Sequence, residues 1–197
     1  MTPKLLLSVF FILFIYCPLF SQNTDSLEAL LDTIQGEGKV KAFNELFRGH
    51  LRSDPVKAVG FAPEALILAG GIDVRRGMAA AYNNLGVAYR NQGALDKALE
   101  YYIISLNIYD SLQQKEGVAT TKNNMANIYS IKKDYAQAMR YLEESYKLFQ
   151  ELNDPFRLIG SMNNLGNLYQ DIDLHDKALE FYTKAYALSE QNGAKFG

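Results

Sequence analysis

The chain has 197 residues, of which 48% are hydrophobic, and its 20 basic and 22 acidic residues give a net charge of -2 at pH 7. Because disordered chains are poor in apolar residues, this composition excludes disorder as the state of the whole chain. No run of Lys or Arg exceeds two residues, so the sequence lacks the basic patch by which proteins bind nucleic acids.

The first 21 residues have the layout of a secretory signal peptide. Lys4 supplies a positive start, residues 5–20 are almost continuously apolar, and Ser21 is a small residue before the polar Gln22. The apolar run is shorter than the roughly 20 residues of a membrane-spanning helix. We therefore predict a cleaved signal over residues 1–21 and an exported protein of the periplasm or cell envelope. An uncleaved membrane anchor is the alternative.

The only cysteine, Cys17, lies inside this segment. It follows the bulky Tyr16, whereas a bacterial lipobox has a small residue there, which disfavours a lipoprotein. Cleavage after residue 21 would leave no cysteine for disulfides, thiol catalysis or thiolate metal sites.

A short amphipathic element follows the signal segment. Leu27, Leu30, Leu31 and Ile34 have the spacing i, i+3, i+4 and i+7 of a single helix face. We predict an N-terminal capping helix within residues 22–37.

Residues 38–76 resemble a degenerate copy of the units that follow. Residues 38–46 align without gaps to residues 77–85. Asp54-Pro55 predicts the start of a second helix, because Asp is a good N-cap and Pro suits the first helical position. Pro63 lies inside this helix and predicts a kink.

A tetrapeptide then recurs with a period of 40 residues, which is typical of a stacked repeat array. We predict three regular units, over residues 77–116, 117–156 and 157–196. The three copies are Asn83-Asn84-Leu85-Gly86, Asn123-Asn124-Met125-Ala126 and Asn163-Asn164-Leu165-Gly166.

Each unit reads as two helices separated by a short turn. In the first unit, one apolar stripe surrounds Leu85, Gly93 breaks the pattern, and a second stripe surrounds Tyr102. Small residues occupy the places where the two helices must approach closely. They are Gly86, Ala126 and Gly166 on the first helix, and Ala98, Ala138 and Ala178 on the second.

These residues resemble the tetratricopeptide repeat, in the longer subgroup with an Asn-Leu-Gly signature. Leu85, Gly86, Tyr89, Ala98 and Tyr102 match its pattern, and the next copy departs from it with Leu142 in the aromatic place. The resemblance implies an all-α fold, a right-handed α-solenoid of helix-turn-helix repeats. It further implies a non-catalytic module that binds a peptide or a helix of another protein.

The sequence contains no catalytic or metal-binding constellation, and we predict neither enzymatic activity nor a cofactor. His50 and His175 are the only histidines, and neither has a ligand partner at helical spacing. Gly70-Gly71 ends a helix and is not followed by the Lys-Ser or Lys-Thr of a phosphate loop.

In the tetratricopeptide family the first helix of each pair lines a concave groove. Carried over by position, the groove candidates are Asn83, Asn84, Asn123, Asn124, Asn127, Asn163, Asn164 and Asn167. An Asn amide both donates and accepts hydrogen bonds, which suits an extended peptide backbone.

Two interpretations of these asparagines remain open. Asn84, Asn124 and Asn164 serve either ligand binding or the stacking of neighbouring repeats, whereas Asn127 and Asn167 favour ligand contact. The basic clamp of some family members is not expected, because its matching places hold Ala80, Thr120 and Gly160 or Asn.

Two functions fit this sequence. One is an exported protein-interaction module; the other is the N-terminal sensory part of a larger membrane-bound signalling protein, with a membrane span and an effector beyond Gly197. The last predicted helix is as apolar as the internal ones, with Leu179 and Tyr186 among its residues. Because terminal repeats usually have a polar outer face, we expect a fragment or a face covered by a partner, and self-association through this helix.

Overall fold

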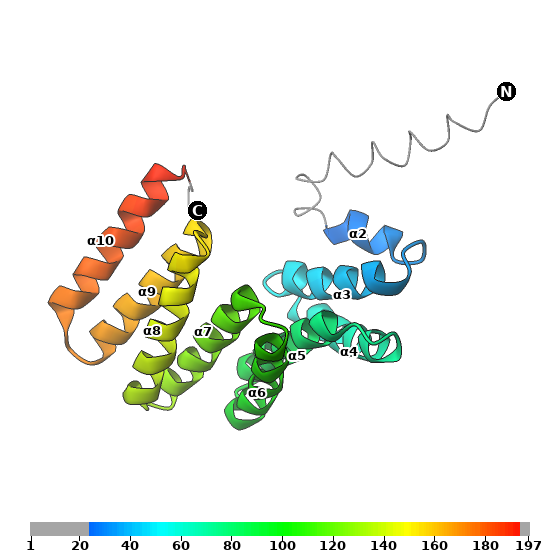
Figure 1. Ribbon diagram of the computed structural model, residues 1–197, viewed down its shortest axis with the longest axis horizontal. Helices are drawn as coiled ribbons and strands as arrows, with labels where there is room; N and C mark the ends of the chain where they lie inside the picture. Colours follow the sequence, from blue (N-terminus) through cyan, green and yellow to red (C-terminus); the bar gives the residue numbers. More distant parts are fainter. Residues whose placement is uncertain (1–23, 194–197) are drawn as a thin grey trace.

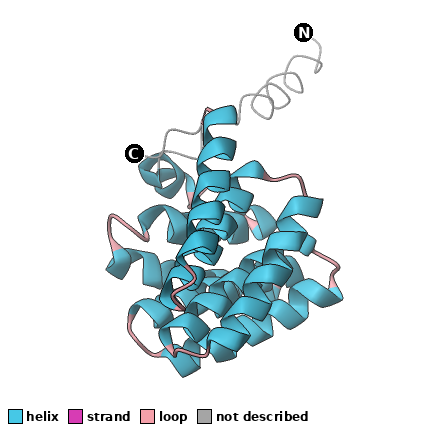
Figure 2. Cartoon of the chain, turned by 90° about the vertical axis from the view of Figure 1, so that its left-hand side faces the viewer, coloured by secondary structure: helices cyan, strands magenta, loops and turns pink. Residues whose placement is uncertain are grey.

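A computed structural model describes residues 24–193, and within these residues the chain forms helices and short loops (Figure 2). The helices succeed one another along an arc, with α2 at one end and α10 at the other (Figure 1). They are α2 Thr24–Leu30, α3 Gly36–His50, α4 Pro55–Gly71, α5 Arg75–Asn91, α6 Leu95–Ser111, α7 Lys115–Ile131, α8 Tyr135–Glu151, α9 Pro155–Asp171 and α10 His175–Gln191. The signal segment 1–21 lies outside the described residues.

The helices form antiparallel pairs that repeat every 40 residues. The first helices α5, α7 and α9 begin at Arg75, Lys115 and Pro155, and α3 and α4 form a pair of the same kind before them. Each pair also packs on the next, and α3, α5, α7 and α9 contact one another in succession. The predicted all-α solenoid of helix-turn-helix repeats is therefore confirmed.

The turns between helices share one backbone conformation. From residue 73 to residue 193, a residue in the left-handed region occurs at every 20th position, and only Gly93 and Gly193 among these residues are glycines. The others are Asp73, Gln113, Lys133, Asn153 and Asp173, with φ between 50° and 60°. Asn and Asp tolerate this conformation better than most residues, which is consistent with three of the five. The expected helix stop at Gly93, with φ of 77°, is confirmed.

Small residues set the distance between paired helices, as the sequence predicted. Ala98, Ala138 and Ala178 are buried, and Ala126 belongs to the same buried cluster as Ala138. Hydroxyls add a second link. Ser105 Oγ donates to the carbonyl oxygen of Ala79 (2.8 Å), and Ser145 Oγ donates to that of Ala119 (2.9 Å). Each bond ties the second helix of a unit to its own first helix.

The N-terminal elements differ in detail from the expectations. α2 ends at Leu30, so Leu31 and Ile34 of the predicted stripe lie beyond it, and the Thr33 hydroxyl donates to the Leu30 carbonyl (2.7 Å) just after the end. Asp54 caps α4 by accepting from the amide of Lys57, as predicted. α4 runs through Pro63 as one helix, with the proline on the exposed side.

No helix among residues 24–193 is both long enough and apolar enough to cross a membrane.

Candidate functional site

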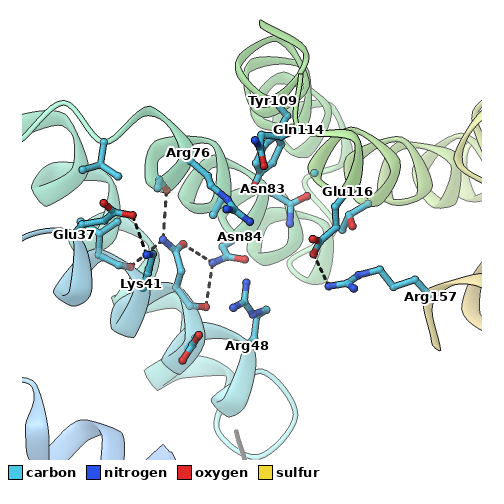
Figure 3. Close-up of a pocket in the computed structure, with 18 residues that line it drawn as sticks. Glu37, Lys41, Arg48, Arg76, Asn83, Asn84, Tyr109, Gln114, Glu116 and Arg157 are labelled. Carbon is cyan, nitrogen blue, oxygen red and sulfur yellow. Dashed lines mark hydrogen bonds and ion pairs between the residues drawn. The ribbon is translucent and has the colours of Figure 1, made fainter. Parts of the chain in front are cut away.

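The inner helices enclose a hollow of about 530 Å³ (Figure 3). α3, α5 and α7 supply most of its wall, the ring of Tyr109 reaches it from α6, and Arg157 reaches it from α9. Its polar and small lining residues include Lys41, Glu45, Arg48, Arg76, Ala80, Asn83, Asn84, Glu116 and Thr120. The hollow is thus bounded by charged and amide groups from successive repeats.

Equivalent positions of successive repeats contribute to the lining of the hollow. Ala80 and Thr120 are equivalent residues one period apart, and both line the hollow with small, half-buried side chains. The third equivalent is Gly160, which is exposed on α9. The small residues at this position leave the space that larger side chains would fill.

The asparagine pairs form a hydrogen-bonded ladder between repeats. In each step, the second Asn of one unit donates its Nδ2 to the Oδ1 of the first Asn of the preceding unit. The bonds are Asn84 to Asn44 (2.8 Å), Asn124 to Asn83 (3.0 Å) and Asn164 to Asn123 (3.0 Å). Asn84, Asn124 and Asn164 therefore link neighbouring repeats, as the stacking interpretation expects.

The ladder also orients the first asparagine of each pair. The Oδ1 atoms of Asn83 and Asn123 accept from the next unit, which fixes the side-chain amide. No protein acceptor within residues 24–193 receives a bond from their Nδ2 groups, although Asn44 Nδ2 donates to the carbonyl of Val40 (3.0 Å). Asn83 and Asn123 thus retain a free amide donor, and Asn83 lines the hollow.

The remaining candidates lie farther along the array. Asn163 and Asn167 are exposed on α9, while Asn127 is half-buried on α7, and none of the three lines the hollow. Asn167 Oδ1 accepts a hydrogen bond from the hydroxyl of Tyr182 (2.6 Å). Asn127 has no such partner, because Leu142 occupies the equivalent of Tyr182. The structure brings Asn83 and Asn84 together at the hollow and leaves the other candidates outside it.

Four basic residues of the hollow were not predicted from the sequence, in which the clamp positions hold Ala80, Thr120 and Gly160 and a basic clamp was therefore not expected. Lys41 pairs with Glu37 (2.9 Å), and Arg157 pairs with Glu116 (2.7 Å). The other two are Arg48 and Arg76. Arg76 lies one helical turn before Ala80 and could have been found from the same spacing.

Burial raises the pKa of Tyr109, while the nearby charges of Arg48 and Arg76 act in the opposite direction. Its ring packs on Gly117, where a Cβ atom would clash with it. The phenol is therefore a neutral hydrogen-bond donor at physiological pH.

The histidines do not form a metal site. His50 is buried and stacks on Phe61, with its Nε2 3.8 Å from Glu28, whereas His175 is exposed. Across residues 24–193, no three His, Cys, Asp or Glu side chains gather in a way that could hold a metal ion.

The family model for the tetratricopeptide repeat matches residues 77–151 and again residues 117–191. The chain belongs to the tetratricopeptide repeat family. The two matches are offset by one 40-residue unit, so the family pattern and the observed helix pairs have the same register.

Solved structures show the same fold at low sequence identity. BtubC (BKLC) from P. vanneervenii is 20% identical with a TM-score of 0.69, over 88% of this chain and 76% of that one. A Rap protein complexed with competence and sporulation factor is 17% identical with a TM-score of 0.75, over 83% of this chain and 46% of that one. Aspartyl phosphate phosphatase F from Bacillus subtilis is 14% identical with a TM-score of 0.72, over 85% and 44%. A comparison with curated proteins found no match.

Proposed function

We propose that this chain is a non-catalytic, exported interaction module that binds an extended peptide segment of another protein in the hollow between α3, α5 and α7. The observation that carries this proposal is a pair of free amide donors that the ladder holds at repeat spacing: Asn83 lines the hollow, and Asn123 lies one unit further along the array. Membership of the tetratricopeptide family supports the same function.

The peptide backbone is the chemistry that this arrangement fits. An extended chain presents carbonyl acceptors at regular intervals, whereas the carbonyls of a helix are bonded internally. Orientation of the amides before binding lowers the entropic cost of binding. A structurally similar Rap protein has been solved with competence and sporulation factor bound, which agrees with a ligand-binding role for this fold.

Selection from a random peptide library by the purified chain tests the proposal. Thr120→Phe fills the hollow from its half-buried floor and should abolish binding of the selected peptides without lowering the melting temperature. Ala136→Phe is the matched control, because it adds the same side chain at an exposed position of α8, outside the lining of the hollow. Equal binding by both variants would rule out this site.

The second candidate function is the sensory region of a larger membrane-bound signalling protein. It is supported by the outer face of α10, where Leu179 is 65% and Tyr186 67% exposed. The equivalent residues Met139 and Tyr146 are half-buried beneath the following unit. Sequencing the reading frame downstream of the codon for Gly197 would test this candidate by the presence or absence of a span and an effector.

A further inference from the structure

Two arginines of the hollow form no ion pair with an acidic side chain of residues 24–193, although Arg76 is close enough to Glu37 to contribute to the lowered pKa of that carboxyl. Arg48 comes from α3 and Arg76 from the start of α5, and both line the hollow. No ion pair within residues 24–193 involves either guanidinium. The other two cations are already neutralised, since Lys41 pairs with Glu37, and Arg157 pairs with both Glu116 and Asp154.

The two charges belong to the same local environment. Both guanidinium groups act on the pKa of the Tyr109 hydroxyl, which they lower against the effect of burial. Figure 3 shows Arg48 and Arg76 on the two sides of the hollow, with Asn83 and Tyr109 close to Arg76. The free Nδ2 of Asn83 adds a further donor to the same wall.

Acidic groups do not balance these donors. Among the lining carboxylates, Glu37 and Glu116 are paired, and only Glu45 lacks an ion pair in the described part of the chain. The net charge of the whole chain is -2, so the positive character is local to this hollow.

We infer that Arg48 and Arg76 bind the carboxylate of an acidic side chain in the ligand; this inference rests on the peptide-binding function proposed above. Arginine holds a carboxylate through two parallel N–H···O bonds, and charge-assisted bonds are stronger than neutral ones. An Asp or Glu side chain is preferred over a terminal carboxylate for a structural reason. The amide donors of Asn83 and Asn123 continue from the arginines toward α9, which allows the peptide backbone to extend along them.

The test compares peptides selected from the same random library by the unchanged chain and by the Arg48→Ala/Arg76→Ala variant. Every library peptide carries a C-terminal amide, so enrichment of Asp or Glu reports side-chain recognition alone. We expect enrichment with the unchanged chain and its loss with the variant. For one selected peptide, each arginine should account for about a tenfold change in affinity.

Glu45→Gln is the matched control at the same hollow. It removes the one unpaired negative charge and should keep or strengthen binding of the acidic peptides. Melting temperatures of all variants should equal that of the parent, because Arg48, Arg76 and Glu45 are exposed.

The outcomes separate this inference from the proposed function. If the selected peptides showed no enrichment of Asp or Glu and Thr120→Phe abolished their binding, the carboxylate site would be overturned and the proposed peptide-binding function would still be supported. Acidic peptides that bind the double arginine variant equally well would also overturn it. Failure to select any peptide would refute both.

Discussion

Gly86 lies directly against the ring of Tyr102: a Cβ atom at residue 86 would come within 2.9 Å of Cζ and closer still to Cδ1 and Cε1. Gly166 meets Tyr182 in the same way in the last unit. In the middle unit both partners change together, since Ala126 replaces the glycine and Leu142 replaces the tyrosine. The methyl group of Ala126 occupies space that the ring of a tyrosine at position 142 would need. This explains why Leu142 departs from the family pattern.

We expect Gly86→Ala to lower the free energy of unfolding by about 1–3 kcal/mol, because the added methyl overpacks the contact with Tyr102. The double variant Gly86→Ala/Tyr102→Leu reproduces the middle unit, so its loss should be smaller than the sum of the single losses. Urea denaturation of the four proteins of this cycle measures the coupling.

Gly60→Ala is the control for helix propensity, because nothing lies within 4 Å of a Cβ at this position of α4. It should stabilise the chain by about 0.5–1 kcal/mol. Additive losses in the Gly86 and Tyr102 cycle would show that the two residues do not constrain each other.

The hydroxyl groups of the two tyrosines differ in their partners. Tyr182 donates to Asn167 and Gln170, whereas the buried Tyr102 hydroxyl has no hydrogen-bond partner, because Val87 stands in the place of Asn167. Burial raises the pKa of Tyr102 well above its usual range, so the group stays protonated. We expect Tyr102→Phe to raise stability by about 1–3 kcal/mol, since it removes an unsatisfied buried polar group.

Tyr182→Phe is the matched comparison and should lower stability, by up to about 1 kcal/mol, because it breaks existing bonds. Thermal denaturation of both variants measures the difference. A loss of stability in Tyr102→Phe equal to that in Tyr182→Phe would indicate that the Tyr102 hydroxyl is satisfied in solution.

The asparagines should separate into two classes. Asn127→Ala with Asn167→Ala should weaken binding of a peptide that extends beyond the hollow along α7 and α9, by about 0.5–1.5 kcal/mol for each lost bond, and should lower stability only through loss of the Asn167–Tyr182 bond. Asn124→Ala should lower the melting temperature as well, because it removes the bond that holds Asn83. Calorimetry of unfolding and of peptide binding tests both statements, and equal loss of stability and affinity in the first variant would favour a structural role for its residues.

The fold could be predicted because its signals are local and repeated three times. The 40-residue period fixes the register, and Gly86, Ala98 and their equivalents mark the close helix contacts. The extent of the capping helix was less predictable. Leu31 and Ile34 continue an apolar pattern, yet α2 ends at Leu30, since a pattern of apolar residues does not fix where a short helix ends.

The site was predictable only where it follows the period. Asn83 and Asn84 recur and were found, whereas Arg48 belongs to the degenerate unit and Tyr109 comes from a second helix. Whether an asparagine donates to the preceding repeat or keeps a free donor depends on how its side-chain amide is oriented. That orientation is set by inter-repeat bonds of 2.8–3.0 Å, which spacing alone does not reveal.

Export is tested by the N-terminus of the secreted product. Because Lys4, the apolar run and Ser21 have the order of a signal peptide, we expect the mature chain to begin near Gln22. N-terminal sequencing of the protein recovered from the cell envelope decides the question. A recovered chain that starts at Met1 would contradict cleavage and favour the anchor.

The outer face of α10 should drive self-association at micromolar concentration. Leu179 and Tyr186 are largely exposed there, and exposed apolar patches of this kind are typical of interaction sites. We expect Leu179→Glu/Tyr186→Glu to shift the sedimentation profile toward the monomer without lowering the melting temperature. Ile67→Glu is the control, because Ile67 is 71% exposed on α4, at the other end of the array. If Ile67→Glu dissociated the assembly as well as the α10 variant does, association would not depend on α10. An unchanged chain that sediments as a monomer would contradict self-association itself.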